Sequence, residues 1–250
     1  MSARLLPACL SALRWAPRMA LCFAAAAAGP SWAASPVAAP PALAASLPAP
    51  SSLAEAPAPS GTAWPGWQDP VLLDKAWSLP VAATYKPAIE FQRNLSFCGP
   101  TSLANVSHSL GLPGDQGDML DGTGIHTILG LLPGGLTLDE LARVARHRFA
   151  GQRVTVWRGL DLAAFRQQLR QANEPGRRYI VNFSRAPLFG RGGGHHAPIA
   201  GYLAQEDLVL VLDVNAAYGP WLVKPARLLQ AMNTLDSSSH QLRGLLLIAR

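Results

Sequence analysis

A proline- and alanine-rich stretch over residues 34–68 limits where this chain can form a packed core. It holds seven prolines between Pro36 and Pro59 and a single charged residue, Glu55. Such a segment buries too little apolar surface to offset the entropy lost on ordering, so the sequence predicts an extended, disordered tether. A packed core must therefore come from residues 69–250, which are numerous enough for one substantial domain.

Residues 1–33 have the layout of a secretory signal peptide. Three arginines precede the apolar run Met19–Ala28, and the small residues Ser31 and Ala33 stand where a signal peptidase reads. The apolar run has ten residues, whereas a membrane-spanning helix needs about 20, so no transmembrane segment is expected. The alternative is an alanine-rich disordered N-terminus, but the signal peptide is the favoured interpretation. It predicts a secreted or periplasmic protein.

Cleavage after residue 33 would change both the charge and the cysteine content. It removes three arginines and no acidic residue, so the formal net charge falls from +6 to +3. The remaining arginines form no dense basic stripe interleaved with aromatics, and no nucleic-acid partner is expected. Cys9 and Cys22 are removed as well, which leaves Cys98. An unpaired thiol in an oxidising compartment requires a reason, such as burial, dimerisation or chemistry.

Cys98 lies at the start of a predicted amphipathic helix over residues 101–110, in which apolar residues recur at three- and four-residue spacing. Pro100 is tolerated only in the first turn of a helix, so Cys98 is expected at the N-terminus. The amides and the dipole at a helix N-terminus favour the thiolate, which is the attacking form of cysteine. Cys98 is therefore a candidate nucleophile. The alternative is a small buried hydrophobe.

The rest of the domain predicts an α+β fold. Thr137 begins a capping-box pattern for a helix through about Phe149, and Asp161 caps another through about Ala172. Runs rich in β-branched and aromatic residues then predict strands. These runs are Val154–Trp157, Tyr179–Phe183, Pro198–Ala204, Leu208–Val214 and Gly244–Ala249. Helices come mostly first and strands mostly later, without the regular alternation of a doubly wound sheet.

A base for Cys98 is predicted at one end of this sheet. His195 and His196 stand where one strand begins, and Asp213 ends the next strand, so an antiparallel hairpin would make them neighbours, with 213 opposite about 198. Asp213 follows five apolar residues, and a buried carboxylate needs a partner. Orienting an imidazole would supply that partner; the alternative is an aspartate that caps a turn. Adjacent strand residues point to opposite faces, so the two histidines are not expected to share a metal ion.

Gln92 precedes Cys98 by six residues. A side-chain amide in that place can donate to an oxyanion, although a loop glutamine on its own is usually surface filler. The chain order of glutamine, cysteine, histidine and aspartate resembles that of papain-like cysteine peptidases, in which a six-residue gap from glutamine to cysteine is typical.

Six motifs in order extend this likeness to the phytochelatin synthase family, over roughly Leu79 to Arg250. The motifs are Phe97–Leu103, Tyr179–Phe183, Gly194–Ile199, Leu212–Val214, Met232–Ser237 and Arg243–Ile248. The resemblance implies a papain-like fold, with N-terminal helices packed on a C-terminal antiparallel sheet and the nucleophile at a helix start. It implies that Cys98 is the nucleophile and Gln92 the oxyanion-hole residue. It also implies that His195, rather than His196, is the catalytic histidine and that Asp213 orients it.

The resemblance further implies an activity on glutathione. Such enzymes release glycine through a γ-glutamylcysteinyl thioester and pass the acyl group to water or to a second glutathione. The cysteine-rich half of the plant members is missing here, as in the short bacterial type, which is expected to act mainly as a hydrolase. No cofactor is expected to be required. Cd²⁺ or Zn²⁺ is expected as a stimulant or in substrate thiolates, so the partners are glutathione and metal–glutathione thiolates, with no protein metal site.

Two other hypotheses remain open. The segment after Asp213 is about two residues shorter than is usual in the family, and it lacks an arginine three residues past the aspartate. This departure motivates a periplasmic cysteine endopeptidase, similar to the double-glycine leader peptidases. The third hypothesis is a non-enzymatic thiol- or metal-binding protein that uses Cys98 and the histidine pair.

Overall fold

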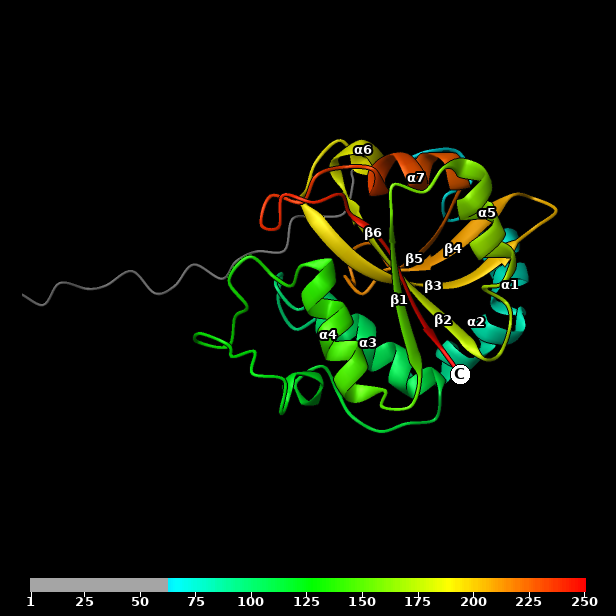
Figure 1. The fold of residues 1–250 in the computed structure, drawn as a ribbon. Helices are drawn as coiled ribbons and strands as arrows, with labels where there is room; N and C mark the ends of the chain where they lie inside the picture. The colour runs from blue at the N-terminus through cyan, green and yellow to red at the C-terminus, as the bar shows by residue number, and fades with distance from the viewer. Residues whose placement is uncertain (1–62) are drawn as a thin grey trace, which may run out of the picture. The chain divides into compact units, whose positions relative to one another are not determined.

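A computed structural model describes residues 63–250 (Figure 1). The predicted signal peptide and most of the predicted tether lie outside these residues. The helices are α1 (Pro70–Trp77), α2 (Pro80–Tyr85), α3 (Cys98–Ser109), α4 (Leu138–Arg148), α5 (Leu162–Arg170), α6 (Ala186–Phe189) and α7 (Pro225–Met232), with two 3-10 turns, η1 (Lys86–Ala88) and η2 (Asp118–Leu120). The strands are β1 (Arg153–Arg158), β2 (Arg177–Ser184), β3 (Gly194–Leu203), β4 (Leu208–Leu212), β5 (Pro220–Val223) and β6 (Gly244–Ala249).

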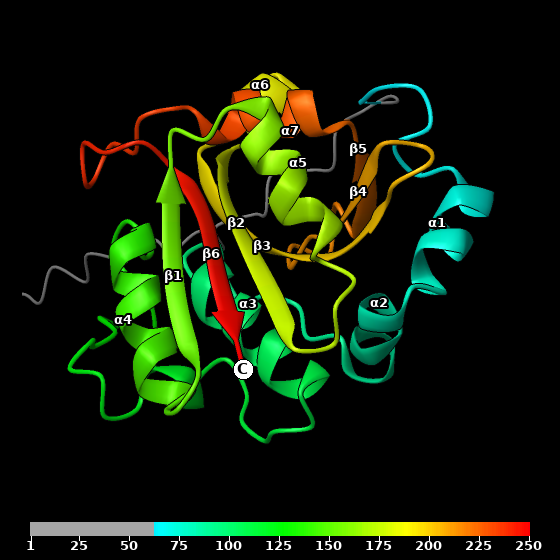
Figure 2. The same cartoon turned by 45° about the vertical axis from the view of Figure 1, so that its right-hand side comes forward.

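The strands form one six-stranded sheet in the order β1-β6-β2-β3-β4-β5. Every neighbouring pair is antiparallel. Figures 1 and 2 show α3 and α4 on one face of the sheet and α5, α6 and α7 on the other. The predicted α+β class is confirmed, with the Cys98 helix packed on a sheet built largely from the C-terminal half.

Both faces of the sheet are buried. In β6, Leu246 and Ile248 belong to the core under α3 and α4, whereas Leu245 and Leu247 belong to the core under α5 and α7. Side chains alternate between the faces of a strand, so a strand covered on both sides reads as a continuous apolar run. The sheet therefore holds the residues at its ends in a rigid frame.

Local signals determine where several helices begin. Thr137 and Glu140 form the predicted capping box at the start of α4, and Asp161 accepts from the Ala164 amide to cap α5. The helices α1, α2 and α7 begin with proline at the first position, where its missing N–H costs nothing. The sequence prediction did not include these three helices, and this proline signal could have found them.

A β-bulge changes the register expected for the β3–β4 hairpin. Tyr202 pairs with Val209, as the predicted register requires, but the pairing shifts by one residue between Ile199 and Gly201. Continued past the bulge, position 213 falls opposite 197 instead of 198, and β4 already ends at Leu212. A bulge adds one residue to one strand of a pair, which the alternation pattern alone does not reveal.

Packing against the sheet begins at Trp64, within the segment 34–68 that the sequence predicts to be a tether. The Trp64 indole N–H donates to the Leu222 carbonyl at 2.9 Å, and the Leu222 amide donates to the Trp67 carbonyl at 2.7 Å. This segment thus lies along β5, a short strand that the sequence prediction missed. Within residues 63–250, no helix has the length and apolar character that crossing a membrane requires.

Candidate active site

Cys98 is the first residue of α3 and is buried, with 5% of its surface exposed. Two side chains brace this first turn: the Thr101 hydroxyl donates to the Phe97 carbonyl and the Ser102 hydroxyl donates to the Cys98 carbonyl, both at 2.7 Å. The first N–H groups of a helix have no partner within the helix. Pro100 has no N–H and the Thr101 N–H donates to the Phe97 carbonyl, so Cys98 stands at the N-terminus of the helix, as predicted from Pro100.

His195 and Asp213 complete the cluster. The His195 Nε2–H donates to Asp213 Oδ1 at 2.9 Å, and the other ring nitrogen is left for the Cys98 side chain, with which His195 forms a hydrogen bond. The structure therefore brings the three predicted residues together in the order Cys98, His195, Asp213.

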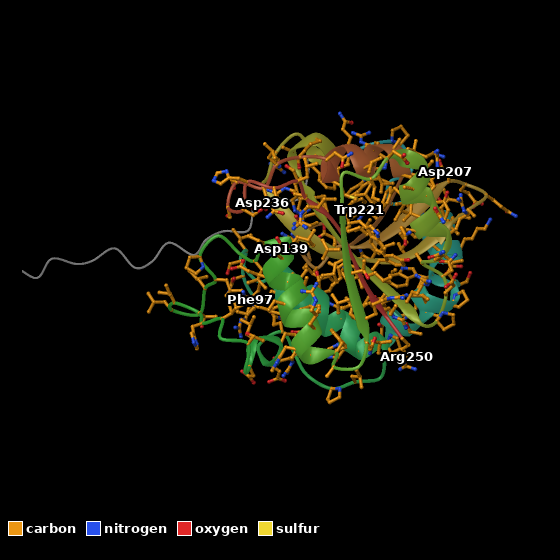
Figure 3. All side chains as sticks on the ribbon, viewed as in Figure 1. Phe97, Asp139, Asp207, Trp221, Asp236 and Arg250 are labelled. Carbon is orange, nitrogen blue, oxygen red and sulfur yellow. The ribbon has the colours of Figure 1, made fainter. Side chains whose placement is uncertain are left out.

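Asp213 is fully buried, and two further side chains bind it. The Arg185 Nη2–H donates to Oδ1 at 2.7 Å, and the Trp221 indole N–H donates to Oδ2 at 3.1 Å (Figure 3 labels Trp221). Burial raises the pKa of the Asp213 carboxyl, but the charges of His195 and Arg185 outweigh burial and hold it well below its usual range. Asp213 is thus a permanent anion at neutral pH.

Arg185 is a site residue that the sequence did not predict. It lies among apolar residues directly after β2, and a buried charge needs a partner. The argument that predicts a partner for the buried Asp213 holds for this arginine as well.

The pKa values of Cys98 and His195 move in opposite directions. Burial raises the pKa of the Cys98 thiol, but its hydrogen bond to His195, the charge of His195 and the His196 backbone N–H lower it below its usual value overall. Burial and Arg185 lower the pKa of the His195 imidazole, whereas Asp213 and the bond to Cys98 raise it above its usual value overall. Both shifts favour a thiolate–imidazolium pair.

Gln92 lies next to the chain segment that follows Asp213. Its backbone N–H donates to the Val214 carbonyl at 2.8 Å, which fixes the glutamine beside the end of the hairpin. Its side-chain oxygen Oε1 is buried and accepts no hydrogen bond from the described residues. Gln92 and His195 together line a cavity that does not include Cys98.

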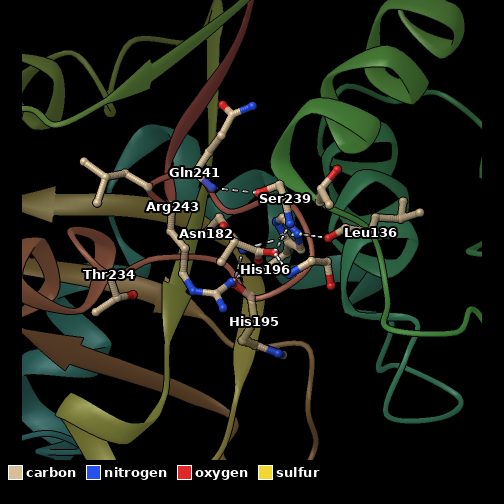
Figure 4. Close-up of polar contacts among 12 residues, drawn as sticks. Leu136, Asn182, His195, His196, Thr234, Ser239, Gln241 and Arg243 are labelled. Carbon is tan, nitrogen blue, oxygen red and sulfur yellow. Dashed lines mark hydrogen bonds and ion pairs between the residues drawn. The ribbon is translucent and has the colours of Figure 1, made fainter.

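His196 points away from its neighbour His195. Its Nε2–H donates to the Leu136 carbonyl at 2.8 Å, and burial lowers the pKa of its imidazole to about 4, so the ring is neutral (Figure 4). The two histidines thus face different partners, as alternation along a strand requires. Within residues 63–250, no group of three His, Cys, Asp or Glu side chains is placed to hold a metal ion.

A cavity of about 250 Å³ opens beside Cys98. Its wall includes Asn182 and Arg243, and the Arg243 guanidinium forms an ion pair with Asp236 (Figure 4). The guanidinium lies against Gly194, where any Cβ would overlap it. Arg243 and Asp236 belong to motifs singled out in the sequence, but the sequence did not assign them to the site.

The arrangement supplies the parts that nucleophilic acyl transfer needs. Cys98 is an activated thiol, His195 can exchange a proton with it, and Asp213 fixes the orientation of the imidazole. The cavity beside the sulfur offers a charged guanidinium to a substrate.

Comparison with known proteins places this site in a family. The model of the phytochelatin synthase family matches residues 70–245, which is most of the chain. The chain is 36% identical over 120 residues to glutathione gamma-glutamylcysteinyltransferase 1 of Triticum aestivum. The aligned residues are 46% of this chain and 24% of the wheat protein. It is 34% identical over 120 residues to glutathione gamma-glutamylcysteinyltransferase 3 of Lotus japonicus, and this alignment covers 46% of this chain and 25% of the Lotus protein. The chain thus spans about a quarter of the length of these relatives.

A solved structure is also similar. A putative C39-like peptidase from Bacillus anthracis matches with a TM-score of 0.47 and 12% identity, over 66% of this chain and 96% of that chain. The match to the family model covers the helix with Cys98, the hairpin with His195 and Asp213, and the Asp236–Arg243 segment. This chain belongs to the phytochelatin synthase family.

Proposed function

We propose that the chain cleaves the Cys–Gly bond of glutathione, as a γ-glutamylcysteinyltransferase and glutathione hydrolase. The observation that carries the proposal is the Cys98–His195 contact at the edge of a cavity that also holds Arg243. The Cys98 thiolate attacks the carbonyl carbon of the Cys–Gly bond and forms a γ-glutamylcysteinyl thioester. The names of the relatives from wheat and Lotus support this substrate.

The unpaired polar atoms of the Cys98 cavity support a substrate with an amino-acid head. Arg243 Nε is a buried donor without a partner among the described residues, and Asn182 Oδ1 and His196 Nδ1 are buried acceptors in the same state. Leaving such groups unpaired is costly, so a ligand that pairs them gains affinity. The γ-glutamyl group carries an α-carboxylate and an α-ammonium, which fit one donor and two acceptors. The interior of a long peptide has no such charged head.

The proton moves through His195. The imidazolium donates its proton to the nitrogen of the departing glycine as the C–N bond breaks, and Asp213 holds the ring in place and stabilises its charge. In the second stage the neutral imidazole takes a proton from water or from the amine of a second glutathione, which then attacks the thioester.

Gln92 and the Cys98 backbone N–H form the oxyanion hole in this proposal. The Cys98 amide belongs to the first turn of α3, where no helical acceptor is available. The Gln92 side chain lines a cavity that His195 also borders, and its amide is the second donor to the carbonyl oxygen in this proposal. Donors placed in advance of the reaction stabilise the developing charge most effectively.

The proposal extends to metal and to location. Cd²⁺ and Zn²⁺ act through thiolate complexes of glutathione, with no metal held by the protein, and the mature protein works outside the cytoplasm after loss of residues 1–33. Adding Cd²⁺ to the assay tests the first statement. Sequencing the N-terminus of the chain after expression in cells tests the second.

A product assay with a trapped intermediate tests the function. Incubation of the purified chain with glutathione should release glycine and γ-glutamylcysteine, and an acid quench should leave a γ-glutamylcysteinyl adduct on Cys98 in the mass spectrum. The Cys98→Ala variant should release neither product, whereas Arg166→Lys, at a surface ion pair with Asp207, should match the parent. Figure 3 shows Asp207 far from Asp236.

Three results would contradict the proposal in distinct ways. Retained activity in Cys98→Ala would exclude Cys98 as the nucleophile. An adduct of any other mass, formed from a peptide, would favour the endopeptidase. Tight metal binding that Cys98→Ser abolishes, without turnover of glutathione, would favour a binding protein.

A further inference from the structure

The Gln116 side chain is buried in the loop between α3 and η2. Its Nε2 donates to the Phe91 carbonyl at 3.0 Å and to Glu90 Oε1 at 2.6 Å, and its Oε1 accepts from the Arg93 backbone N–H at 2.9 Å. The Phe91 carbonyl and the Arg93 N–H belong to the two peptide groups that flank Gln92. Gln116 therefore holds the backbone on both sides of the proposed oxyanion-hole residue.

Gln92 depends on such contacts for its position. It lies between η1 and α3 in a segment without helix or strand, so no ladder of backbone hydrogen bonds fixes it. Its own N–H donates to the Val214 carbonyl at 2.8 Å. Asn105 of α3 accepts from the Glu90 N–H at 3.0 Å and donates to the Glu90 carbonyl at 2.8 Å. Since Cys98 begins the same helix, α3 carries both the nucleophile and an anchor for the segment of Gln92.

The polarity of the Gln116 amide matches its partners. The Phe91 carbonyl can only accept and the Arg93 N–H can only donate, so one end of the amide faces each. Gln116 is not among the described residues that line the Cys98 cavity or the cavity of Gln92 and His195. It can thus affect the reaction only through the residues that it holds.

We infer that Gln116 is a positioning residue of the oxyanion hole, which holds Gln92 where its side-chain amide donates to the developing charge. The inference rests on the proposed function and deepens it. A donor stabilises an oxyanion most when it is placed in advance, and a displacement of about 1 Å can cost about 100-fold in rate. The oxyanion forms twice in each turnover, when Cys98 attacks and when the thioester is attacked, so a displaced donor slows both stages.

Replacing Gln116 with methionine in the full chain tests the inference. Methionine is similar in length and makes none of these hydrogen bonds. The kcat for release of glycine from glutathione should fall about 10- to 100-fold, which is less than the loss of about 10²–10³ when an oxyanion-hole donor is removed outright. The KM should change by less than about twofold, because the bound substrate carries no oxyanion. Steady-state kinetics of glycine release measures both constants.

A double-mutant cycle with Gln92→Ala separates positioning from general damage to the fold. Without the Gln92 amide there is no donor to displace, so Gln116→Met should then lower kcat by less than about twofold. A purely structural role would instead lower kcat by the same factor in both backgrounds.

Asn173→Ala is the matched control. Asn173 also binds a backbone N–H and a carbonyl, both of Tyr202, at 3.0 and 2.9 Å. Neither residue is among the described residues that line the Cys98 cavity or the cavity of Gln92 and His195. The variant should lower the midpoint of urea unfolding and leave kcat within about twofold of the parent value.

Gln116→Asn provides a second test that keeps the amide. Its side chain is one methylene shorter, so it cannot reach the Phe91 carbonyl and the Arg93 N–H together, and kcat should fall in the same direction. An unchanged kcat in Gln116→Met, or in Gln116→Asn where the methionine variant does not fold, would overturn the inference. An equal loss of kcat with and without the Gln92 amide would overturn it as well. Failure of the proposed function is distinct, because the parent chain itself would then release no glycine from glutathione.

Discussion

Asp213 shows at the level of one residue how the site is held. It accepts hydrogen bonds from the His195 ring, the Arg185 guanidinium, the Trp221 indole and the Asn215 amide while it is fully buried. Four donors hold the carboxylate in a single orientation, and its hydrogen bond to the His195 ring in turn fixes the orientation of the imidazole. The aspartate is therefore both an electrostatic partner and a positional reference for the site.

Replacing Asp213 with asparagine should impair stability as well as activity. The variant leaves Arg185 buried without an anionic partner, a change that typically costs about 3–5 kcal/mol. Glutathione cleavage should fall by about 10²–10⁴, because the imidazole loses its preferred tautomer. Urea unfolding and the glycine assay measure the two effects.

The stability difference should depend on pH with a definite sign. The pKa of Asp213 is lower in the folded than in the unfolded chain, so its contribution is complete above the unfolded value of about 3.9. It is lost as the pH falls toward the folded value. The difference in the free energy of unfolding between the parent and Asp213→Asn should therefore become smaller below about pH 4. A difference that becomes larger there would contradict the ion pair.

Cys98 should react with alkylating agents at a pH where ordinary thiols are inert. Its pKa is lowered, so the rate of carbamidomethylation by iodoacetamide should reach half its maximum below pH 8.5, the usual thiol value. His195→Ala removes a hydrogen bond and a charge and should move this midpoint upward. Peptide mapping separates Cys98 from Cys9 and Cys22. A parent midpoint at or above the usual value would contradict the thiolate.

At the level of elements, the entry of β3 joins the two halves of the site. His195 and His196 lie on opposite faces of the strand, and Gly194 before them lets the Arg243 guanidinium lie against the backbone. His195 is thus the candidate base, and His196 forms a neutral wall of the Cys98 cavity. Gly194 leaves room for the guanidinium at the charged end of that cavity. A change of one residue in this register would exchange the roles of the two histidines.

Replacing Gly194 with alanine should therefore damage substrate binding. The new Cβ would overlap Arg243 and displace its guanidinium, so the KM for glutathione should rise about tenfold or more, the value of one charge-assisted hydrogen bond. Gly193→Ala is the matched control, because a Cβ there meets no atom within 4 Å. Steady-state kinetics on both variants measures the effect, and equal KM values would contradict the role of Arg243.

The helix starts explain which parts of the fold the sequence predicts. Cys98 before Pro100, the Thr137 capping box and Asp161 are local signals, and the structure places helices at each of them. The Arg185–Asp213 pair joins residues 28 positions apart, from two different elements. The β3 bulge adds one residue to a hairpin without changing its pattern of apolar residues. Capping rules and periodicity therefore reveal neither feature.

At the scale of the whole molecule, an aromatic cluster connects the first described residues to the cavity that Gln92 and His195 line. Trp64 packs against Phe189 and Trp221, with ring centres 5.5 and 5.7 Å apart, and Phe189 packs against Tyr218 at 4.8 Å. Tyr218 in turn lies under Arg185. The N-terminal segment thus packs behind the wall of the cavity that Arg185 and Tyr218 line.

Removing the Trp64 ring should weaken the whole domain. Trp64→Ala loses a half-buried indole and its hydrogen bond to the Leu222 carbonyl, which should lower the free energy of unfolding by about 2–3 kcal/mol. Val71→Ala, at a side chain that is 75% exposed in the same region, should change it by less than about 0.5 kcal/mol. Chemical denaturation compares the two, and similar values would show that the aromatic cluster adds nothing.

The place of β6 in the sheet has a consequence for how the protein is made. β6 is the last described strand to leave the ribosome, yet it lies between β1 and β2 and pairs with both. Until it emerges, β1 has no neighbour in the sheet, and both cores lack the apolar side chains of β6. The two layers of the domain are therefore completed only at the end of synthesis, when β6 fills the gap between β1 and β2.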